Sequence, residues 1–322
     1  MKQTACIYTS NTGVGLIADV NLLYDLLEPF YDIDIVYFEH NIGNDSEYNP
    51  YNEYDVGIFI QNFYGQYLDR NKKNIFIANE EWIGLEVHQL YLFDKIIVKS
   101  EFAKQLLAAH NRNIVNCGFV SYDKYDSKID KTDTFFHLVG KSYQKGTEQV
   151  LSTFNKTNLP LTIVESLNHY NKEPLQDNIN FIADFLPKEE VTKQLNSNRF
   201  HLCVSYYEGW GHFLYEGLST GAIAYVSNCP MYTEWLDPEL VVFINSTFTT
   251  SDSNKYSTYP FFQRPKHLIH QFGWVVDEGE LLEKTQEWEH FKNTIDSNAV
   301  RDFVKNVNTK NSKKLTEEIL NT

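Results

Sequence analysis

Short apolar runs rich in β-branched residues alternate with helical stretches along almost the whole chain. This alternation is typical of parallel sheets whose strands are joined by crossover helices. In the first half, helices are clearest at residues 16–27, where apolar positions recur three and four apart, and at 101–109, where Ser100 is placed to cap the N-terminus. Strands are predicted at residues 4–8, 33–38, 56–60, 74–78, 96–99 and 114–116. The pattern therefore predicts an α/β fold.

The alternation lapses once, near the middle of the chain. Residues 121–133 (SYDKYDSKIDKTD) are polar and show neither a helical nor an alternating apolar period. A second series of strands then follows at residues 134–139, 161–165, 180–182, 200–205 and 222–226. We therefore expect two doubly wound domains, residues 1–125 and 126–295, with the polar segment as the linker.

Two further segments complete the chain. Residues 245–272 are rich in Ser, Thr, Tyr, Phe and Pro and fit neither period, so we expect a long excursion from the second domain. Residues 291–322 are predicted to form one or two amphipathic helices.

Composition and charge exclude several classes of protein. With 42% apolar and 22% charged residues in 322, the chain can bury full cores, which argues against disorder. Its 28 basic and 43 acidic residues give a net charge of −15, which does not suit a protein that tracks a nucleic-acid backbone or binds anionic lipid. An anionic ligand must therefore be bound by basic side chains or backbone amides gathered at its own site.

Targeting and metal signals are also weak. The N-terminal apolar run breaks at Ser10, and no run approaches the eighteen apolar residues of a membrane span. The four cysteines lie far apart without a Cys-x-x-Cys pair, and no cluster of residues has metal-ligand spacing. We expect buried, reduced thiols, a cytoplasmic location, no metal and no resident cofactor.

The most informative stretch is residues 206–230, YYEGWGHFLYEGLSTGAIAYVSNCP. A buried strand ends here, a turn built on Gly209 and Gly211 follows, and a helix is predicted from His212 to Gly221. The free amides and the dipole at the start of such a helix attract an anion such as a diphosphate. Glu216 lies one turn into the helix, and acids beside a phosphate site are suited to holding ligand hydroxyl groups.

Glu208 and Glu216, set in E-G-x-G-x-x-x-x-E-G-x-x-x-G, resemble the donor-site motif of the family 4 retaining glycosyltransferases. Residues 140–151 (GKSYQKGTEQVL) look like the family's strand-to-helix loop, whose basic residues grip the nucleotide diphosphate. Lys145 matches the family's Lys, and Lys141 stands where the family usually has Arg, in a loop about one residue shorter. Residues 11–15 (NTGVG) are similar to the family's Gly-rich loop.

The resemblance implies the GT-B fold, in which two Rossmann-like domains face each other across a cleft, with the helix of residues 296–322 returning to the first domain. It implies transfer of a sugar, with retention and without a metal, from a UDP- or GDP-sugar co-substrate to a hydroxyl of a glycan, protein or small-molecule acceptor. The catalytic residues would be Glu208, Lys145 and Lys141, and the tentative acceptor-binding residues Glu80 and Trp82. The donor-binding set would be Gly13, Gly15, Gly140, Gly211, His212, Phe213, Leu214 and Glu216.

Other interpretations stay open. The resemblance covers residues 135–235 best and the first domain only in outline, where Asn79, Glu80 and Glu81 stand in place of a His that many relatives carry. Taken singly, NTGVG fits a tight turn, the two lysines fit a solvated face, and the two glutamates fit surface acids. The alternative functions are a nucleotide-sugar epimerase of the same fold, whose acid and base we cannot identify, and a non-catalytic protein that binds sugar nucleotides.

Overall fold

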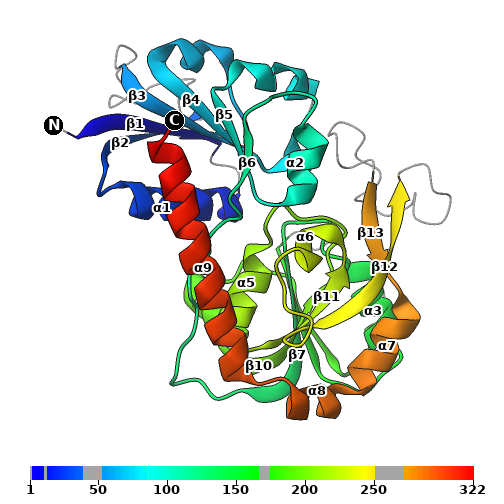
Figure 1. The fold of residues 1–322 in the computed structure, drawn as a ribbon. Coiled ribbons are helices and arrows are strands. Elements are labelled where there is room, and N and C mark those ends of the chain that lie inside the picture. Colours follow the sequence, from blue (N-terminus) through cyan, green and yellow to red (C-terminus); the bar gives the residue numbers. More distant parts are fainter. Residues whose placement is uncertain (1, 11–12, 39–52, 84, 167–174, 251–271) are drawn as a thin grey trace. The chain divides into compact units, whose positions relative to one another are not determined.

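The computed structural model describes residues 2–10, 13–38, 53–83, 85–166, 175–250 and 272–322 (Figure 1). These residues form two compact units. Unit 1 contains the described parts of Met1–Ser121 together with Asn308–Thr322, and unit 2 contains those of Tyr122–Pro265 and His270–Val307. Each unit is built on its own sheet.

The sheet of unit 1 has six parallel strands in the order β2-β1-β3-β4-β5-β6. The strands are β1 (Gln3–Thr9), β2 (Tyr31–Tyr37), β3 (Tyr54–Ile60), β4 (Asn71–Ile77), β5 (Lys95–Val98) and β6 (Ile114–Asn116). The helices are α1 (Val14–Leu27) and α2 (Glu101–Leu107), with 3-10 turns at Gly65–Arg70, Glu80–Trp82 and Leu85–Leu92. The predicted cap is confirmed, because the Ser100 hydroxyl accepts the amide of Ala103 at 3.0 Å.

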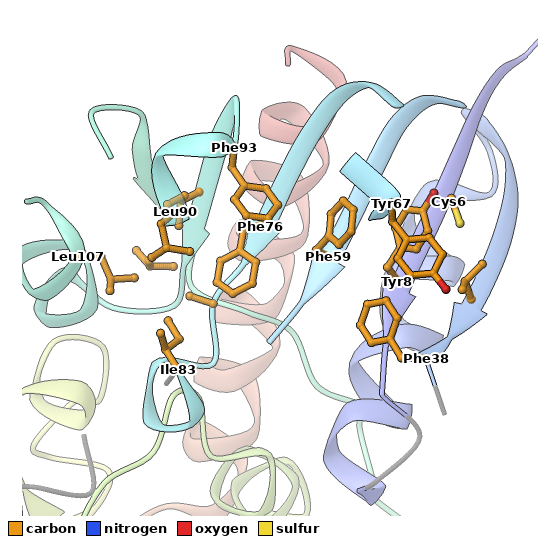
Figure 2. Close-up of a cluster of buried hydrophobic side chains, with 14 of the residues drawn as sticks. Cys6, Tyr8, Phe38, Phe59, Tyr67, Phe76, Ile83, Leu90, Phe93 and Leu107 are labelled. Carbon is orange, nitrogen blue, oxygen red and sulfur yellow. The ribbon is translucent and has the colours of Figure 1, made fainter. Parts of the chain in front are cut away.

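Aromatic side chains fill one face of this sheet (Figure 2). Tyr8 stacks on Phe59 with ring centroids 4.4 Å apart, and Phe76 lies 5.1 Å from Phe93. The alternation of side chains along β3 and β4 directs these rings to the same layer. The high aromatic content of the chain therefore serves packing in this unit.

The sheet of unit 2 has seven strands in the order β13-β12-β11-β10-β7-β8-β9, all parallel except for the β12–β13 pair. The strands are β7 (Thr132–Gly140), β8 (Leu161–Glu165), β9 (Ile179–Ile182), β10 (Asn198–Cys203), β11 (Ile223–Asn228), β12 (Val242–Thr250) and β13 (Phe272–Val276). The helices are α3 (Thr147–Phe154), α4 (Lys188–Ser197), α5 (His212–Ser219), α6 (Pro230–Thr233), α7 (Glu278–Gln286), α8 (Trp288–Thr294) and α9 (Ser297–Leu320).

The expected α/β fold with two doubly wound sheets is confirmed, but the prediction of an irregular excursion at residues 245–272 is wrong at both ends. Residues 245–250 belong to β12, and Phe272 begins β13, which pairs antiparallel with β12 from Thr250↔Phe272 to Ser246↔Val276. The β-branched residues here form an edge hairpin, which the Ser and Thr content obscured. Residues 251–271 lie outside the described part of the chain.

Helix α9 contributes to both units. In unit 2, the Tyr215 hydroxyl donates to the carbonyl of Val304 at 2.7 Å. In unit 1, the Lys95 ammonium donates to the carbonyl of Glu318 at 2.6 Å and to its carboxylate at 3.0 Å. Among the described residues, no helix combines the length and apolar character that a bilayer crossing requires.

The prediction for the cysteines is confirmed in the structure, since all four thiols are free and buried. Burial raises the pKa of Cys6 and of Cys117 to about 12, so neither thiol ionises near neutral pH. These thiols pack as small apolar groups.

Candidate active site

The carboxyl ends of β7 and β10 mark the point where the connections in unit 2 reverse direction. From β7 the chain proceeds outward to β8 and β9, and from β10 it proceeds the opposite way to β11 and β12. In open α/β sheets, ligands bind beside such a reversal. The loops that follow these two strands, residues 141–146 and 204–211, carry the predicted donor-site residues.

These two loops are locked together through their backbones. Gly146 has φ +69°, and a Cβ atom added there would clash with the carbonyl oxygen of Val204. The amide of Tyr206 donates to the carbonyl of Gln144 at 2.7 Å. Only glycine satisfies both the backbone angle and the close approach at position 146.

His137, on β7, connects the end of β10 to the start of α3 next to these two loops. Its Nδ1 lies 2.9 Å from the carbonyl of Leu202 and its Nε2 lies 3.0 Å from the Thr147 hydroxyl. Because a carbonyl only accepts, Nδ1 carries the proton and Nε2 accepts the hydroxyl of Thr147. Burial lowers the pKa of His137 to about 4, so the ring is neutral. Sequence reasoning missed this residue, and its one signal is a histidine inside an apolar strand.

Lys145 and Glu208 meet across the two loops. The Lys145 ammonium lies 2.5 Å from Glu208 Oε1 and 3.7 Å from the centroid of the Phe213 ring. The Ser205 hydroxyl donates to the same carboxylate oxygen at 2.9 Å. The side chains of Lys145 and Glu208 are only 12% and 8% exposed, so their charges interact in a poorly hydrated environment.

Helix α5 begins beside this ion pair. Gly211, with φ +80°, is its N-cap, and no acidic residue occupies the first turn. The amide of Leu214 donates to the Gly211 carbonyl at 2.9 Å, while His212 is half-buried and Phe213 is buried against Lys145. The start of the helix thus places a positive dipole end near the Lys145 ammonium.

Glu216 lies one turn farther along α5. Its carboxylate is 3.6 Å from the Lys124 ammonium, and its side chain is 18% exposed. The backbone amide of Lys124 donates to the Ser219 hydroxyl at 2.9 Å, which fixes this segment against α5. Glu216 therefore keeps a partly accessible carboxylate with a neighbouring cation.

Lys141 stands apart from this cluster. It is exposed directly after Gly140, and its ammonium lies 6.0 Å from the centroid of the Phe185 ring. Gly140 itself has φ +61°. The structure brings Lys145, Glu208 and the start of α5 together, whereas Lys141 lies at the open edge of the loop.

The remaining predicted residues belong to unit 1. Gly13 is the N-cap of α1, and a Cβ atom added at Gly13 or Gly15 would meet nothing within 4 Å. Asn11 and Thr12 lie outside the described residues. Glu80 is fully buried, whereas Trp82 is half-buried at the end of the same 3-10 turn.

The described residues contain no group of three His, Cys, Asp or Glu side chains arranged to hold a metal ion. At the reversal point of unit 2, Lys145 and the N-terminus of α5 supply positive charge.

Comparison with known proteins bears on the fold. No protein-family model and no curated protein sequence matches this chain. A glycosyltransferase from Rickettsia africae and the lipopolysaccharide outer core galactosyltransferase WaaB each have a TM-score of 0.67 at 12% identity; the alignments cover 99% and 100% of this chain and 99% of each of those chains. A sucrose-phosphate synthase from Thermosynechococcus elongatus gives 0.63 at 12% identity over 97% of this chain and 94% of its own.

These likenesses extend over nearly the whole length of each chain. The two sheets of Rossmann-like topology described above correspond to the two domains of those proteins. The chain therefore has the GT-B fold of glycosyltransferases, as its sequence motifs predicted.

Proposed function

We propose that this protein is a glycosyltransferase that moves a sugar from a nucleoside diphosphate sugar to an acceptor hydroxyl, with retention at the anomeric carbon. The observation that carries the proposal is the contact between Lys145 and Glu208 at the reversal point of unit 2, beside the start of α5. The proteins of similar structure are two transferases and a synthase, which favours sugar transfer over epimerisation.

Lys145 would stabilise the leaving group. As the bond between the anomeric carbon and the phosphate oxygen breaks, its electron pair stays on the diphosphate, whose negative charge grows. One donor of the ammonium is engaged by Glu208, which leaves two for phosphate oxygens. The N-terminus of α5 adds its dipole, and both act strongly because the side chains of Lys145 and Glu208 are largely buried.

Glu208 would bind the hydroxyls of the donor sugar. Its Oε1 accepts from Lys145 and Ser205, and among the described residues none donates to Oε2, which can accept sugar hydroxyls. Its charge also favours the cationic ring of the transition state. Glu216 would hold the ribose hydroxyls, and the acceptor's proton would pass to the departing phosphate as its oxygen bonds to the anomeric carbon.

The test measures donor binding and consumption with UDP-glucose, UDP-galactose, UDP-N-acetylglucosamine and GDP-mannose. One donor should raise the thermal midpoint of the wild type and be hydrolysed slowly to nucleotide. Lys145→Ala should lower turnover about 100-fold with a smaller effect on donor affinity, because its charge matters most in the transition state. Glu216→Ala should weaken donor binding by about 1.5 to 3 kcal/mol.

Lys193→Ala, on the exposed side of α4, is the matched control and should leave both measurements unchanged. Turnover should also survive excess chelator, since Lys145 and the helix terminus supply the positive charge. Loss of turnover with chelator and its rescue by magnesium or manganese would contradict the metal-independent mechanism. An isomerised donor would identify an epimerase, and binding without consumption would identify a binding protein.

A further inference from the structure

Unit 1 carries a second polar site at its own reversal point. Its connections run from β1 to β2 on one side and from β3 to β4, β5 and β6 on the other, so the reversal lies between β1 and β3. Ser10 follows β1, and Gln61 and Asn62 follow β3. Asn62 reaches across the reversal, with its Nδ2 3.5 Å from the Ser10 hydroxyl.

The chain leaves β3 through a strained turn at Gln61. Gln61 has φ +65°, and among the described residues it is the single non-glycine with a positive φ. The amide of Asn62 donates to the carbonyl of Ile60 at 2.7 Å, which closes a three-residue γ-turn around Gln61. This form of the turn is rare and strained, and such strain persists only where the surrounding structure fixes the backbone.

The side chain of Gln61 is linked through Asn79 to a buried ion pair. Lys99 and Asp19, whose side chains are each 2% exposed, lie 3.2 Å apart, and the Lys99 ammonium also donates to Asn79 Oδ1 at 2.5 Å. Asn79 Nδ2 donates to Gln61 Oε1 at 3.3 Å and to Asp19 Oδ2 at 3.4 Å. The strained residue is thus tied to a charge pair in the interior.

The chemistry of these groups fixes the orientation of Gln61. An ammonium only donates, so the oxygen of Asn79 must face Lys99 and its nitrogen must face Gln61. The oxygen of Gln61 therefore faces Asn79, and its Nε2 remains as the donor. Among the described residues, nothing accepts from Gln61 Nε2 and nothing donates to Asn62 Oδ1. Both residues are half-buried.

We propose that Gln61 and Asn62 form the subsite that binds the hydroxyls of a carbohydrate acceptor, with Asp19, Lys99 and Asn79 as the residues that position Gln61. A sugar hydroxyl both donates and accepts, so it suits an amide donor beside an amide oxygen. The groups named at this site, the Ser10 hydroxyl and the amides of Gln61 and Asn62, are uncharged, which favours a neutral sugar over an acidic or cationic acceptor. The assignment as acceptor site rests on the proposed glycosyltransferase function.

The experiment is saturation-transfer NMR with methyl glucosides, methyl galactosides and methyl mannosides, which needs no turnover. Wild type should give a signal with at least one glycoside. Gln61→Gly relieves the strained φ and so should fold, yet it should reduce the signal about five- to tenfold, as expected for loss of one hydrogen bond. Asn62→Ala should act in the same direction, and Gln66→Ala, on the exposed 3-10 turn nearby, is the matched control and should change nothing.

Absence of any signal in wild type, or an unchanged signal in Gln61→Gly, would overturn the proposal. A second readout is the ratio of transfer to donor hydrolysis, which should fall about five- to tenfold in Gln61→Gly. If none of the four nucleotide sugars is consumed by wild type, the proposed function fails, while a glycoside signal lost in Gln61→Gly would still identify the sugar-binding site.

Discussion

In both sheets the connections reverse direction between two neighbouring strands, β1 and β3 in unit 1 and β7 and β10 in unit 2. Unit 2 builds its reversal from glycines with positive φ and leaves its Lys145–Glu208 pair slightly open to solvent. Unit 1 forces a glutamine into a positive φ and closes its Lys99–Asp19 pair to the interior.

The two kinds of turn suit two different ways of binding a ligand. Glycines let backbone amides and a helix terminus approach a bulky anion closely, which suits a diphosphate. A side-chain amide held by a buried network can instead select among neutral hydroxyl groups through directed hydrogen bonds. Under the two proposals above, unit 2 would supply positive charge to a diphosphate, and unit 1 would orient neutral hydroxyl groups.

The largest effect is expected from Lys99→Met. It leaves Asp19 buried without its cation, which should lower the free energy of unfolding by about 3 to 5 kcal/mol. Lys145→Met should lower the free energy of unfolding less, by about 1 to 3 kcal/mol. In this variant Glu208 keeps its hydrogen bond from Ser205, and its carboxylate is more exposed to solvent than that of Asp19. Urea denaturation followed by circular dichroism measures both. The double variant Asp19→Leu with Lys99→Met should recover most of the loss. Equal destabilisation by Lys99→Met and Lys145→Met would contradict the expected effect of the difference in burial between the two ion pairs.

Gly146→Ala tests the backbone contact in unit 2. The new Cβ would meet the carbonyl of Val204 in a backbone conformation that alanine avoids, so we expect a loss of about 2 to 4 kcal/mol. Gly15→Ala, in the first turn of α1 with open space around it, should gain about 0.5 to 1 kcal/mol. Calorimetry would report both shifts. A mild effect at Gly146 would mean that the two loops can separate at little cost.

Acid should destabilise unit 2 through its buried histidines. Burial lowers the pKa of His137 to about 4 and of His201 to about 3, below the ordinary value of 6.5, so the unfolded state takes up protons first as the pH falls. Stability is therefore full above pH 6.5 and decreases toward pH 4, by about 3 kcal/mol for His137 alone. Tryptophan fluorescence reports mainly this unit, which holds four of the five tryptophans.

The matched variant for this effect is His137→Gln, whose amide can donate to Leu202 and accept from Thr147. It should flatten the dependence of unfolding on pH between 6.5 and 4. If its profile follows that of wild type, His137 is not the group that titrates.

The smallest effect is expected from Lys141→Arg, at the open edge of the loop. Lys141 is exposed, and an Arg can keep the contact with the Phe185 ring, so turnover should stay within about threefold of wild type. Lys145→Arg is the contrasting variant and should lose activity, because the longer, planar group does not fit between Glu208 and Phe213. An inactive Lys141→Arg would show that the loop is aligned wrongly with the family motif.

Local patterns predicted the elements well. The strands at 114–116 and 161–165 begin and end as predicted, and α5 begins at His212 as the glycine turn indicated. These features depend on residues adjacent in sequence. The hairpin of β12 and β13 was missed because its pairing joins residues on either side of a long connection, which no short window contains.

The sites were predictable only in part, for the same physical reason. The motif around Glu208 and Glu216 is contiguous, but its contact with Lys145 spans 63 positions. The network in unit 1 joins Asp19, Asn79 and Lys99, which are as many as 80 positions apart. The turn at Gln61 has a positive φ without a glycine, so no residue type in the sequence indicates it. Such contacts arise from strand order, which residue types alone do not encode.

Helix α9 has a consequence for the order of events during synthesis. Unit 1 includes the last part of α9, where Glu318 binds Lys95 and Asn311 donates to the carbonyl of Phe119 at 2.9 Å. A ribosome adding about 5 to 20 residues per second takes about 10 to 40 s to travel from Ser121 to Glu318. Throughout that interval the first-made sheet lacks its last helix, while the whole of the second sheet emerges. The contacts between the first sheet and α9 can therefore form only after the second sheet has been synthesised.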